Sequence, residues 1–341
     1  MSSEITKHNL YAGIAELLQV SRQAVVRSVN QTMVHTYYEI GRMIVEDEQQ
    51  GKERAEYGKQ VLKELSKKLI DNFGKGFSVQ NLENMRKFYL LYEPEGKSQS
   101  PIRISNSNNA TLSWTQYLVL IRIDKKEERS FYEIESLNNN WSVRELKRQF
   151  DSGLYERLAL SRDKAGVKQL AEKGQIIEKP TDLFKDPYIL EFLNLPEQYQ
   201  YSESEFESAI IDKLEHFLLE LGKGFTFVGR QVRMTIDEKH FKVDLVFFNR
   251  LLKCFVVIDL KIGELTHQDI GQMQMYVNYH DRFVRLPDEN KTIGIILCKD
   301  KSQTLVEITL PENNDQIFAS KYQTILPNKE TFIQLLNDKE V

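Results

Sequence analysis

Two carboxylates and a lysine occupy an otherwise apolar stretch of this sequence. Asp244 lies near the start of the segment 243–263, and Asp259 and Lys261 lie near its end. In a strand, residues two apart point to the same face, about 7 Å from each other. Asp244 belongs to the preceding apolar run, and the short turn NRLLK is typical of a hairpin. We therefore expect Asp244 to lie beside Asp259.

The chemistry of such a cluster points to a metal ion. Two adjacent carboxylates repel each other, and burying them costs several kcal/mol each unless a positive charge lies between them. A divalent cation removes that cost, and oxygen ligands suit Mg²⁺ or Mn²⁺. Lys261 would then hold and help to activate a water beside the metal. The alternative is an ordinary ion pair between Asp259 and Lys261 at a strand end, with Asp244 in solvent.

Length and composition set the frame for this site. The 341 residues suggest two domains, and the net charge of −4 leaves room for a local basic face. The two cysteines, Cys254 and Cys298, lie in apolar runs and are expected to be buried thiols in a reducing compartment. The N-terminus lacks the pattern of a signal peptide, and no run of about 18 apolar residues predicts a membrane span. The default expectation is a cytoplasmic protein.

The first half of the chain has helical periodicity. Apolar residues recur at three- and four-residue spacing over 10–48, over 60–73 and again from 112 onwards. The segment GKGFS, 74–78, ends one helix, and Ser78 is placed to cap the next, 79–92, which outlines a helix-turn-helix. Residues 93–111 are polar and predict a loop or disordered insertion. Ser142 and Glu145 form a capping box. We expect an all-helical domain over residues 1–174.

The second half, 175–341, has the pattern of an α/β domain with a mixed sheet. A helix over 203–222 ends at a glycine. Strands follow at 225–236, 242–249 and 253–263 as a meander, then a helix at 269–283 and a strand at 291–300. In the run CFVVIDL every residue except Asp259 is apolar, so a strand here would be apolar on both of its faces. It is therefore expected to be a central strand covered on both sides.

Asp244, then about fifteen residues, then Asp-x-Lys at the end of a buried hairpin strand followed by a helix, resembles the restriction-endonuclease-like PD-(D/E)XK nucleases. Longer strings resemble the YhcG-like family of these bacterial nucleases: FLLELGKGFTFVGRQVRM, VDLVFFNRLLKCFVVIDLKIG, GQMQMYVNYHD and TIGIILCKDK. The N-terminal half also resembles this family, in the strings FGKGFSVQNLENMRKFY, LSWTQY and WSVRELKRQ. The resemblance covers nearly the whole chain. Its one departure is Asp259, where the family usually carries Glu, and the superfamily accepts either residue.

The resemblance implies a Mg²⁺-dependent endonuclease acting on DNA, in defence against foreign DNA or in DNA recombination or repair. Asp244 and Asp259 would bind Mg²⁺ or Mn²⁺, with the Leu260 carbonyl as a further ligand. Lys261 would act on the attacking water.

Five more residues gain candidate roles from the same resemblance. Nucleases of this fold often supply a carboxylate from the helix before the first strand, and Glu207 is that candidate. Gln272 and Tyr276 share a helical face just after the lysine strand, as in RecB-like nucleases, where this pair supports the site and touches DNA. Arg230 and Gln231, in the string VGRQ, either approach the phosphates or pair at a strand edge.

The helix-turn-helix is a candidate DNA-binding face. Residues 52–92 hold nine Lys/Arg and five Asp/Glu, a local net charge of +4. Lys75, Gln80, Asn81 and Asn84 lie at the turn and the start of its second helix, where contacts with DNA would be made. The alternative is a solvated face of a helical bundle. The resemblance also allows a partner-binding role, and the long first helices could pack in a homodimer.

Two other functions compete with a DNA endonuclease. A non-catalytic DNA-binding or assembly subunit could keep the nuclease fold, although retention of Asp244, Asp259 and Lys261 argues against it. An RNA-directed nuclease is disfavoured by the lack of an obvious aromatic stacking platform.

Overall fold

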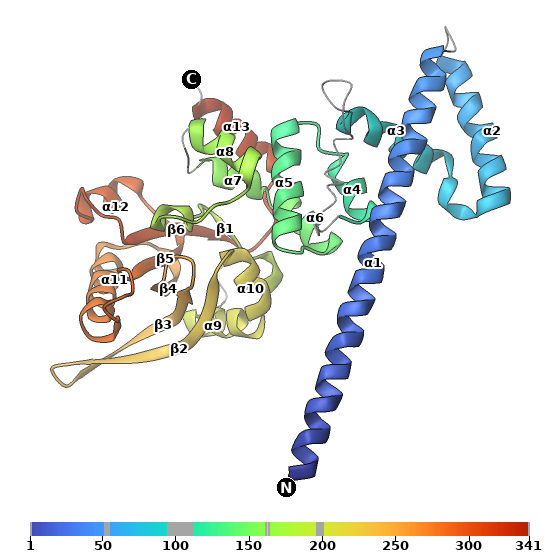
Figure 1. Ribbon diagram of the computed structural model, residues 1–341. Coiled ribbons are helices and arrows are strands. Elements are labelled where there is room, and N and C mark those ends of the chain that lie inside the picture. The colour runs from blue at the N-terminus through green and yellow to red at the C-terminus, as the bar shows by residue number, and fades with distance from the viewer. Residues whose placement is uncertain are drawn as a thin grey trace. The chain divides into compact units, whose positions relative to one another are not determined.

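The computed structural model describes residues 2–50, 55–93, 112–160, 162, 164–195 and 201–339. The chain divides into two compact units, Met1–Lys147 and Arg148–Val341 (Figure 1). No described helix combines the length and the apolar character that crossing a membrane requires. Of the expected loop at 93–111, residues 94–111 lie outside the described residues.

The first unit is helical. Its elements are α1 (Ser2–Gln50), α2 (Ala55–Phe73), the 3₁₀ turn η1 (Lys75–Phe77), α3 (Val79–Tyr92), α4 (Trp114–Leu120), α5 (Lys126–Asn138) and the start of α6 (Val143–Asp151). The expected helices are therefore confirmed, and the first two begin earlier than periodicity indicated. Ser78 caps α3 by accepting a hydrogen bond from the Asn81 N–H, and Ser142 accepts one from the Glu145 N–H.

Close packing of α1 on α3 depends on Gly41. A Cβ atom at this position would lie 2.1 Å from the Met85 carbonyl oxygen, so no other residue fits without moving the helices apart. Ile44, Leu62 and Leu82 form a buried apolar cluster together with Met85.

The second unit holds the sheet and the remaining helices. In chain order these are α7 (Leu154–Leu160), α8 (Lys164–Lys173), η2 (Pro180–Asp182), β1 (Tyr188–Ile189), η3 (Glu191–Leu193), α9 (Glu203–Asp212), α10 (Leu214–Leu221), β2 (Phe225–Ile236), β3 (Lys239–Asn249), β4 (Cys254–Glu264), α11 (His267–Tyr279), the π-turn η4 (His280–Val284), β5 (Ile293–Asp300), α12 (Gln303–Thr309), β6 (Ile317–Gln323) and α13 (Lys329–Lys339).

The six strands form one mixed sheet in the order β1-β6-β5-β4-β3-β2. Strands β2, β3 and β4 form the expected antiparallel meander, and β4, β5 and β6 run parallel. One face of β4 contributes Val256 and Ile258 to the core that includes residues of α9 and α10, and the other contributes Val257 to the core with α11. The prediction of a central strand covered on both faces is confirmed, and Cys254 and Cys298 are free and buried within it and its neighbour β5.

Some elements differ from the sequence expectations. The helix expected over 203–222 is divided at Lys213, whose backbone is not helical (φ −117°, ψ 29°). Strands β1 and β6 complete the sheet beyond β5, although β1 is only two residues long and so has no periodicity to detect.

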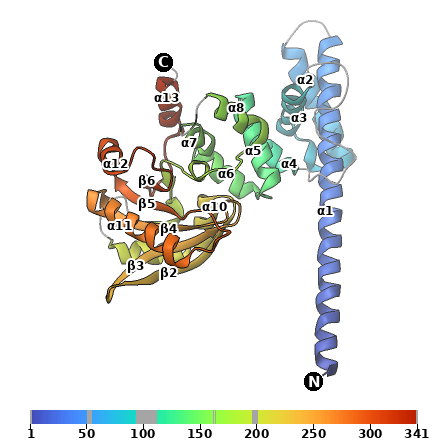
Figure 2. The ribbon, with the colours of Figure 1, turned by 60° about the vertical axis from the view of Figure 1, so that its left-hand side comes forward.

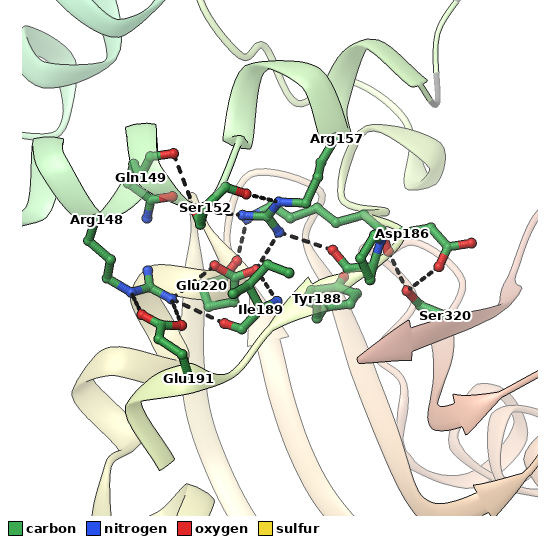
Figure 3. A network of polar contacts seen from close by, with 12 residues as sticks. Arg148, Gln149, Ser152, Arg157, Asp186, Tyr188, Ile189, Glu191, Glu220 and Ser320 are labelled. Carbon is green, nitrogen blue, oxygen red and sulfur yellow. Dashed lines mark hydrogen bonds and ion pairs between the residues drawn. The ribbon is translucent and has the colours of Figure 1, made fainter. Parts of the chain in front are cut away.

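The segment 148–174 packs with the sheet, so the contacts divide the chain earlier than the boundary near residue 175 that the sequence predicts. The reason is a buried polar network around Glu220 of α10 (Figure 3). Arg157 Nη1 lies 2.6 Å from Glu220 Oε1, and both side chains are fully buried. Arg148 Nη2 lies 3.3 Å from Glu220 Oε2 and also pairs with Glu191.

Backbone groups complete this network. The Ile189 N–H donates to Glu220 Oε1 at 3.0 Å, and Lys185 Nζ donates to the Glu220 carbonyl. Arg157 also donates to the Pro187 carbonyl. Because these charges are satisfied only together, they fix Arg148 and α7 against α10 and β1.

Candidate active site

The site predicted around Asp244 lies where β3 separates from β4. Pairing between these strands begins at Asn249 and Cys254 and ends at Leu245 and Ile258. Asp244 and Asp259 are the next positions along the two strands. We call this point of separation the fork. Asp244 Oδ2 accepts a hydrogen bond of 2.8 Å from the Leu260 N–H across it. The hairpin thus brings the two carboxylates together as the sequence predicted.

Asp259 is buried and poorly compensated. It is 2% exposed, and its Oδ2 atom is paired with Lys261 Nζ at 3.0 Å. The pKa of Asp259 is raised to about 7, because burial and the charge of Asp244 together outweigh the opposing effect of Lys261. Burial also disfavours the charge on Lys261, but Asp259 and other nearby carboxylates outweigh it and leave the lysine pKa raised.

Gln231 connects two carboxylates at the edge of the site. Its Nε2 atom donates to Glu207 Oε2 at 2.5 Å and to Asp244 Oδ1 at 3.1 Å. Gln231 has a φ of 49°, a left-handed conformation that is uncommon for a residue with a side chain and is concentrated at functional sites. Glu207, on α9, is nearly buried, and Arg230 Nε lies 3.9 Å from its Oε1 atom. The predicted residues Glu207, Arg230 and Gln231 are therefore brought together with Asp244.

Helix α11 is tied to the same part of β3. Tyr276 Oη donates to the Lys242 carbonyl at 2.9 Å, and Gln272 Nε2 donates to Tyr276 Oη. Burial raises the pKa of Tyr276, so the hydroxyl keeps its proton for this bond. The hydrogen bonds of the two side chains run to each other and to the backbone of β3. Gln272 and Tyr276 therefore position the backbone two residues before Asp244.

Sequence reasoning missed Asp269. Its Oδ2 atom accepts from the Thr266 N–H at 2.8 Å in a capping box at the start of α11, while Oδ1 lies 3.9 Å from Lys261 Nζ. The signal was present, because Thr266 followed three residues later by Asp269 marks a helix start. Lys261 therefore lies between two carboxylates.

The residues at the fork fit a hard divalent cation. Asp244 and Asp259 supply carboxylate oxygens, and Lys261 compensates the buried Asp259 only in part. Since the N–H and C=O of one strand residue point to the same edge, the Leu260 carbonyl faces the side on which its N–H meets Asp244. Among the described residues no group of three His, Cys, Asp or Glu is arranged to hold a metal. A cation here would therefore rely on two carboxylates, a backbone carbonyl and water.

The other predicted nucleic-acid residues lie in the first unit. Lys75 and Gln80 are exposed at the turn between α2 and α3, and Asn84 is half-buried. Asn81 is engaged inside the unit, because its Nδ2 atom donates to the Gly76 carbonyl and its Oδ1 atom accepts from Trp114 Nε1.

Comparison with known proteins matches both halves of the chain. Residues 181–337 match the family model of the YhcG PDDEXK nuclease domain, and residues 13–157 match that of the DUF1016 N-terminal domain. The Escherichia coli (strain K12) protein named "Putative nuclease YhcG" is 40% identical, over 94% of this chain and 91% of its own.

Solved structures resemble the chain more remotely. A repair endonuclease from Pyrococcus abyssi is 18% identical, with a TM-score of 0.26, over 38% of this chain and 50% of its own. EndoMS in complex with dsDNA2 is 19% identical, with a TM-score of 0.26, over 39% and 50%. The two family models and the long relative at 40% identity are decisive: the chain belongs to the YhcG family of PDDEXK nucleases.

Proposed function

We propose that this protein is a Mg²⁺-dependent DNA endonuclease and that the fork between β3 and β4 is its active site. One observation carries the proposal. Asp244, the buried Asp259 and Lys261 converge there, and Lys261 compensates the charge of Asp259 only in part. Buried carboxylates that the chain itself does not neutralise are typical of sites completed by a ligand.

Each residue at the fork has a distinct role. Asp244, Asp259 and the Leu260 carbonyl hold Mg²⁺ or Mn²⁺. When bound, such an ion withdraws charge from the phosphate and makes a nearby water more acidic. Lys261 presents an ammonium group next to Asp259, where it orients the attacking water and faces the developing negative charge. Gln231 holds the carboxylates of Asp244 and Glu207 in place by donating a hydrogen bond to each.

The first unit would contribute binding rather than chemistry. Its α2–α3 turn exposes Lys75 and Gln80 in a segment of local positive charge, which supports contact with DNA phosphates.

The first half of α1 supports a second role in assembly. It exposes ten large apolar side chains between Leu10 and Met33, and only three residues of that stretch are charged. An exposed apolar surface of this kind is typical of an interface with another protein. We propose that a second copy of the chain packs against it. Light scattering of the full chain and of Leu18→Glu/Val25→Glu would test this, with a mass of one chain for the wild type contradicting it.

A cleavage assay tests the catalytic proposal. Linear, circular, single-stranded and branched DNA would be incubated with Mg²⁺, Mn²⁺ or EDTA and with wild type, Asp259→Ala or the surface control Asp212→Ala. We expect metal-dependent cutting by the wild type and the control, and none by Asp259→Ala.

Other outcomes point to the competing functions. If all three proteins bind DNA equally and none cuts it, a non-catalytic binding subunit is the better description. Cutting of RNA but not of DNA would replace the substrate and keep the site.

A further inference from the structure

Strands β2 and β3 continue beyond the last residue pair that β3 makes with β4. The two-stranded extension, residues 232–243 and here called the hairpin arm, projects from the sheet in both views (Figures 1 and 2). It begins one residue past Gln231 on β2 and ends one residue before Asp244 on β3. The candidate active site therefore lies at its base.

The two faces of the hairpin arm differ in character. Val232, Met234, Phe241 and Val243 belong to the apolar cluster that includes α11. On the opposite face, Arg233 pairs directly with Lys242 across the strands, and Thr235 pairs with His240. All four of these side chains are exposed.

The outer face places positive charges against each other. Like charges directly opposite in a ladder destabilise it. Arg233 Nη2 lies 2.6 Å from His240 Nε2, while His240 Nδ1 lies 3.1 Å from the Thr235 hydroxyl. The guanidinium thus donates to the ring nitrogen, and the imidazole supplies no charge to balance it.

No carboxylate relieves this repulsion. Within the described ranges neither Arg233 nor Lys242 has an ion pair, although Asp237 and Glu238 lie at the tip of the same hairpin. Two fixed cations without an anion are unfavourable alone and become favourable beside a polyanion.

We propose that the outer face of the hairpin arm binds the phosphate backbone of the nucleic-acid substrate through Arg233 and Lys242. This rests on the proposed nuclease function and adds a binding surface to it. Arg233 and Lys242 are each two residues from Gln231 and Asp244, about 7 Å along a strand, which corresponds to roughly two nucleotides of rise. The contacted phosphates would therefore flank the bond that is cut.

Binding without cleavage provides the direct test. Arg233→Ala/Lys242→Ala would be compared with wild type and with Lys213→Ala/Arg250→Ala, which removes one lysine and one arginine from exposed positions elsewhere in the same unit. Fluorescence anisotropy of a labelled duplex in EDTA, over a series of KCl concentrations, gives Kd and its salt dependence. For the arm variant we expect Kd to rise on the order of tenfold and the log–log salt slope to fall by about 2. The control should match the wild type.

Folding and catalysis are measured on the same proteins. Because the arm substitutions remove a repulsion, the thermal midpoint should equal or exceed that of the wild type. With Mg²⁺, kcat at saturating duplex should be unchanged while KM rises. An unchanged salt slope, or an equal loss in the control, would overturn the proposal for the arm alone, provided that the wild type cuts DNA. A wild type that neither binds nor cuts nucleic acid would overturn both proposals.

Discussion

Glu220 and Asp259 are both buried in the second unit, yet their pKa values are shifted in opposite directions. Burial alone would raise the pKa of Glu220, but Arg157, Lys185 and Arg148 outweigh it and lower the pKa to about 2. Asp259 has one cation within contact distance and a second carboxylate nearby, so burial prevails and its pKa rises to about 7. The two sites differ mainly in the number of positive charges that the chain supplies.

This difference separates a structural charge from a functional one. Every oxygen of the Glu220 carboxylate has an arginine or a backbone donor, so the group is complete within the chain (Figure 3). Asp259 Oδ2 is paired with Lys261, but this cation offsets burial and the charge of Asp244 only in part, which leaves a role for a cation from outside. A fold tolerates such an incomplete site where its function needs it.

The sharpest contrast comes from removing Lys261. We expect Lys261→Met to lower the cleavage rate by about 10²–10⁴-fold, since a group that acts on the attacking water is lost. Stability should change little, because Asp259 can take up a proton when its cation is removed. Steady-state cleavage and urea unfolding of one preparation measure both. A variant that unfolds before it loses activity would place Lys261 with the structural charges.

Removing Arg157 should do the reverse. Arg157→Met leaves Glu220 buried without its closest cation, which costs about 3–5 kcal/mol of unfolding free energy. Urea unfolding measures the loss, and the residual folded protein should still cut DNA. Adding Glu220→Leu should recover part of the stability, because the unpaired charge is then gone. A double variant less stable than Arg157→Met would contradict this account.

Asp259→Asn should have the opposite effect on stability from Arg157→Met: it should stabilise the metal-free protein. In the metal-free protein the folded-state pKa lies above the unfolded value, so the stabilising contribution is complete at low pH and is lost as pH rises through about 7. In EDTA the variant should therefore gain about 1–3 kcal/mol over wild type at pH 8 and little at pH 4, close to the ordinary pKa of an aspartate. Thermal unfolding at the two pH values is the measurement. Mg²⁺ at pH 8 should stabilise the wild type only, and equal stabilisation of both would contradict a cation at Asp259.

The two sites also differ in how far the sequence predicts them. Asp244, Asp259 and Lys261 were placed together because a short turn and strand periodicity fix the register of a hairpin. The partners of Glu220 come from 35, 63 and 72 residues away, through Lys185, Arg157 and Arg148. No local spacing records such contacts, so neither the network nor the earlier division of the chain was predicted.

Two features of the candidate site, the backbone of Gln231 and the position of Asp269, could be predicted from the sequence only in part. The positive φ of Gln231 occurs inside β2, and nothing in VGRQ marks it. Asp269 was readable as a helix cap, but its approach to Lys261 depends on how α11 returns along the sheet. Sequence patterns thus give the element and its chemistry, while the tertiary path decides which charges meet.

The smallest effect is expected from Tyr276, which acts only through the backbone of β3. Tyr276→Phe removes the hydrogen bond to the Lys242 carbonyl, worth about 0.5–1.5 kcal/mol. We expect kcat to fall by about the same free energy, a few-fold to roughly tenfold, with KM unchanged, because Asp244 is displaced and the substrate contacts remain. Tyr279→Phe, on the same helix and with no recorded hydrogen bond of its hydroxyl, is the matched control. Equal losses of kcat in the two variants would mean that α11 supports the fold generally, whereas a loss in Tyr276→Phe alone ties the helix to the position of Asp244.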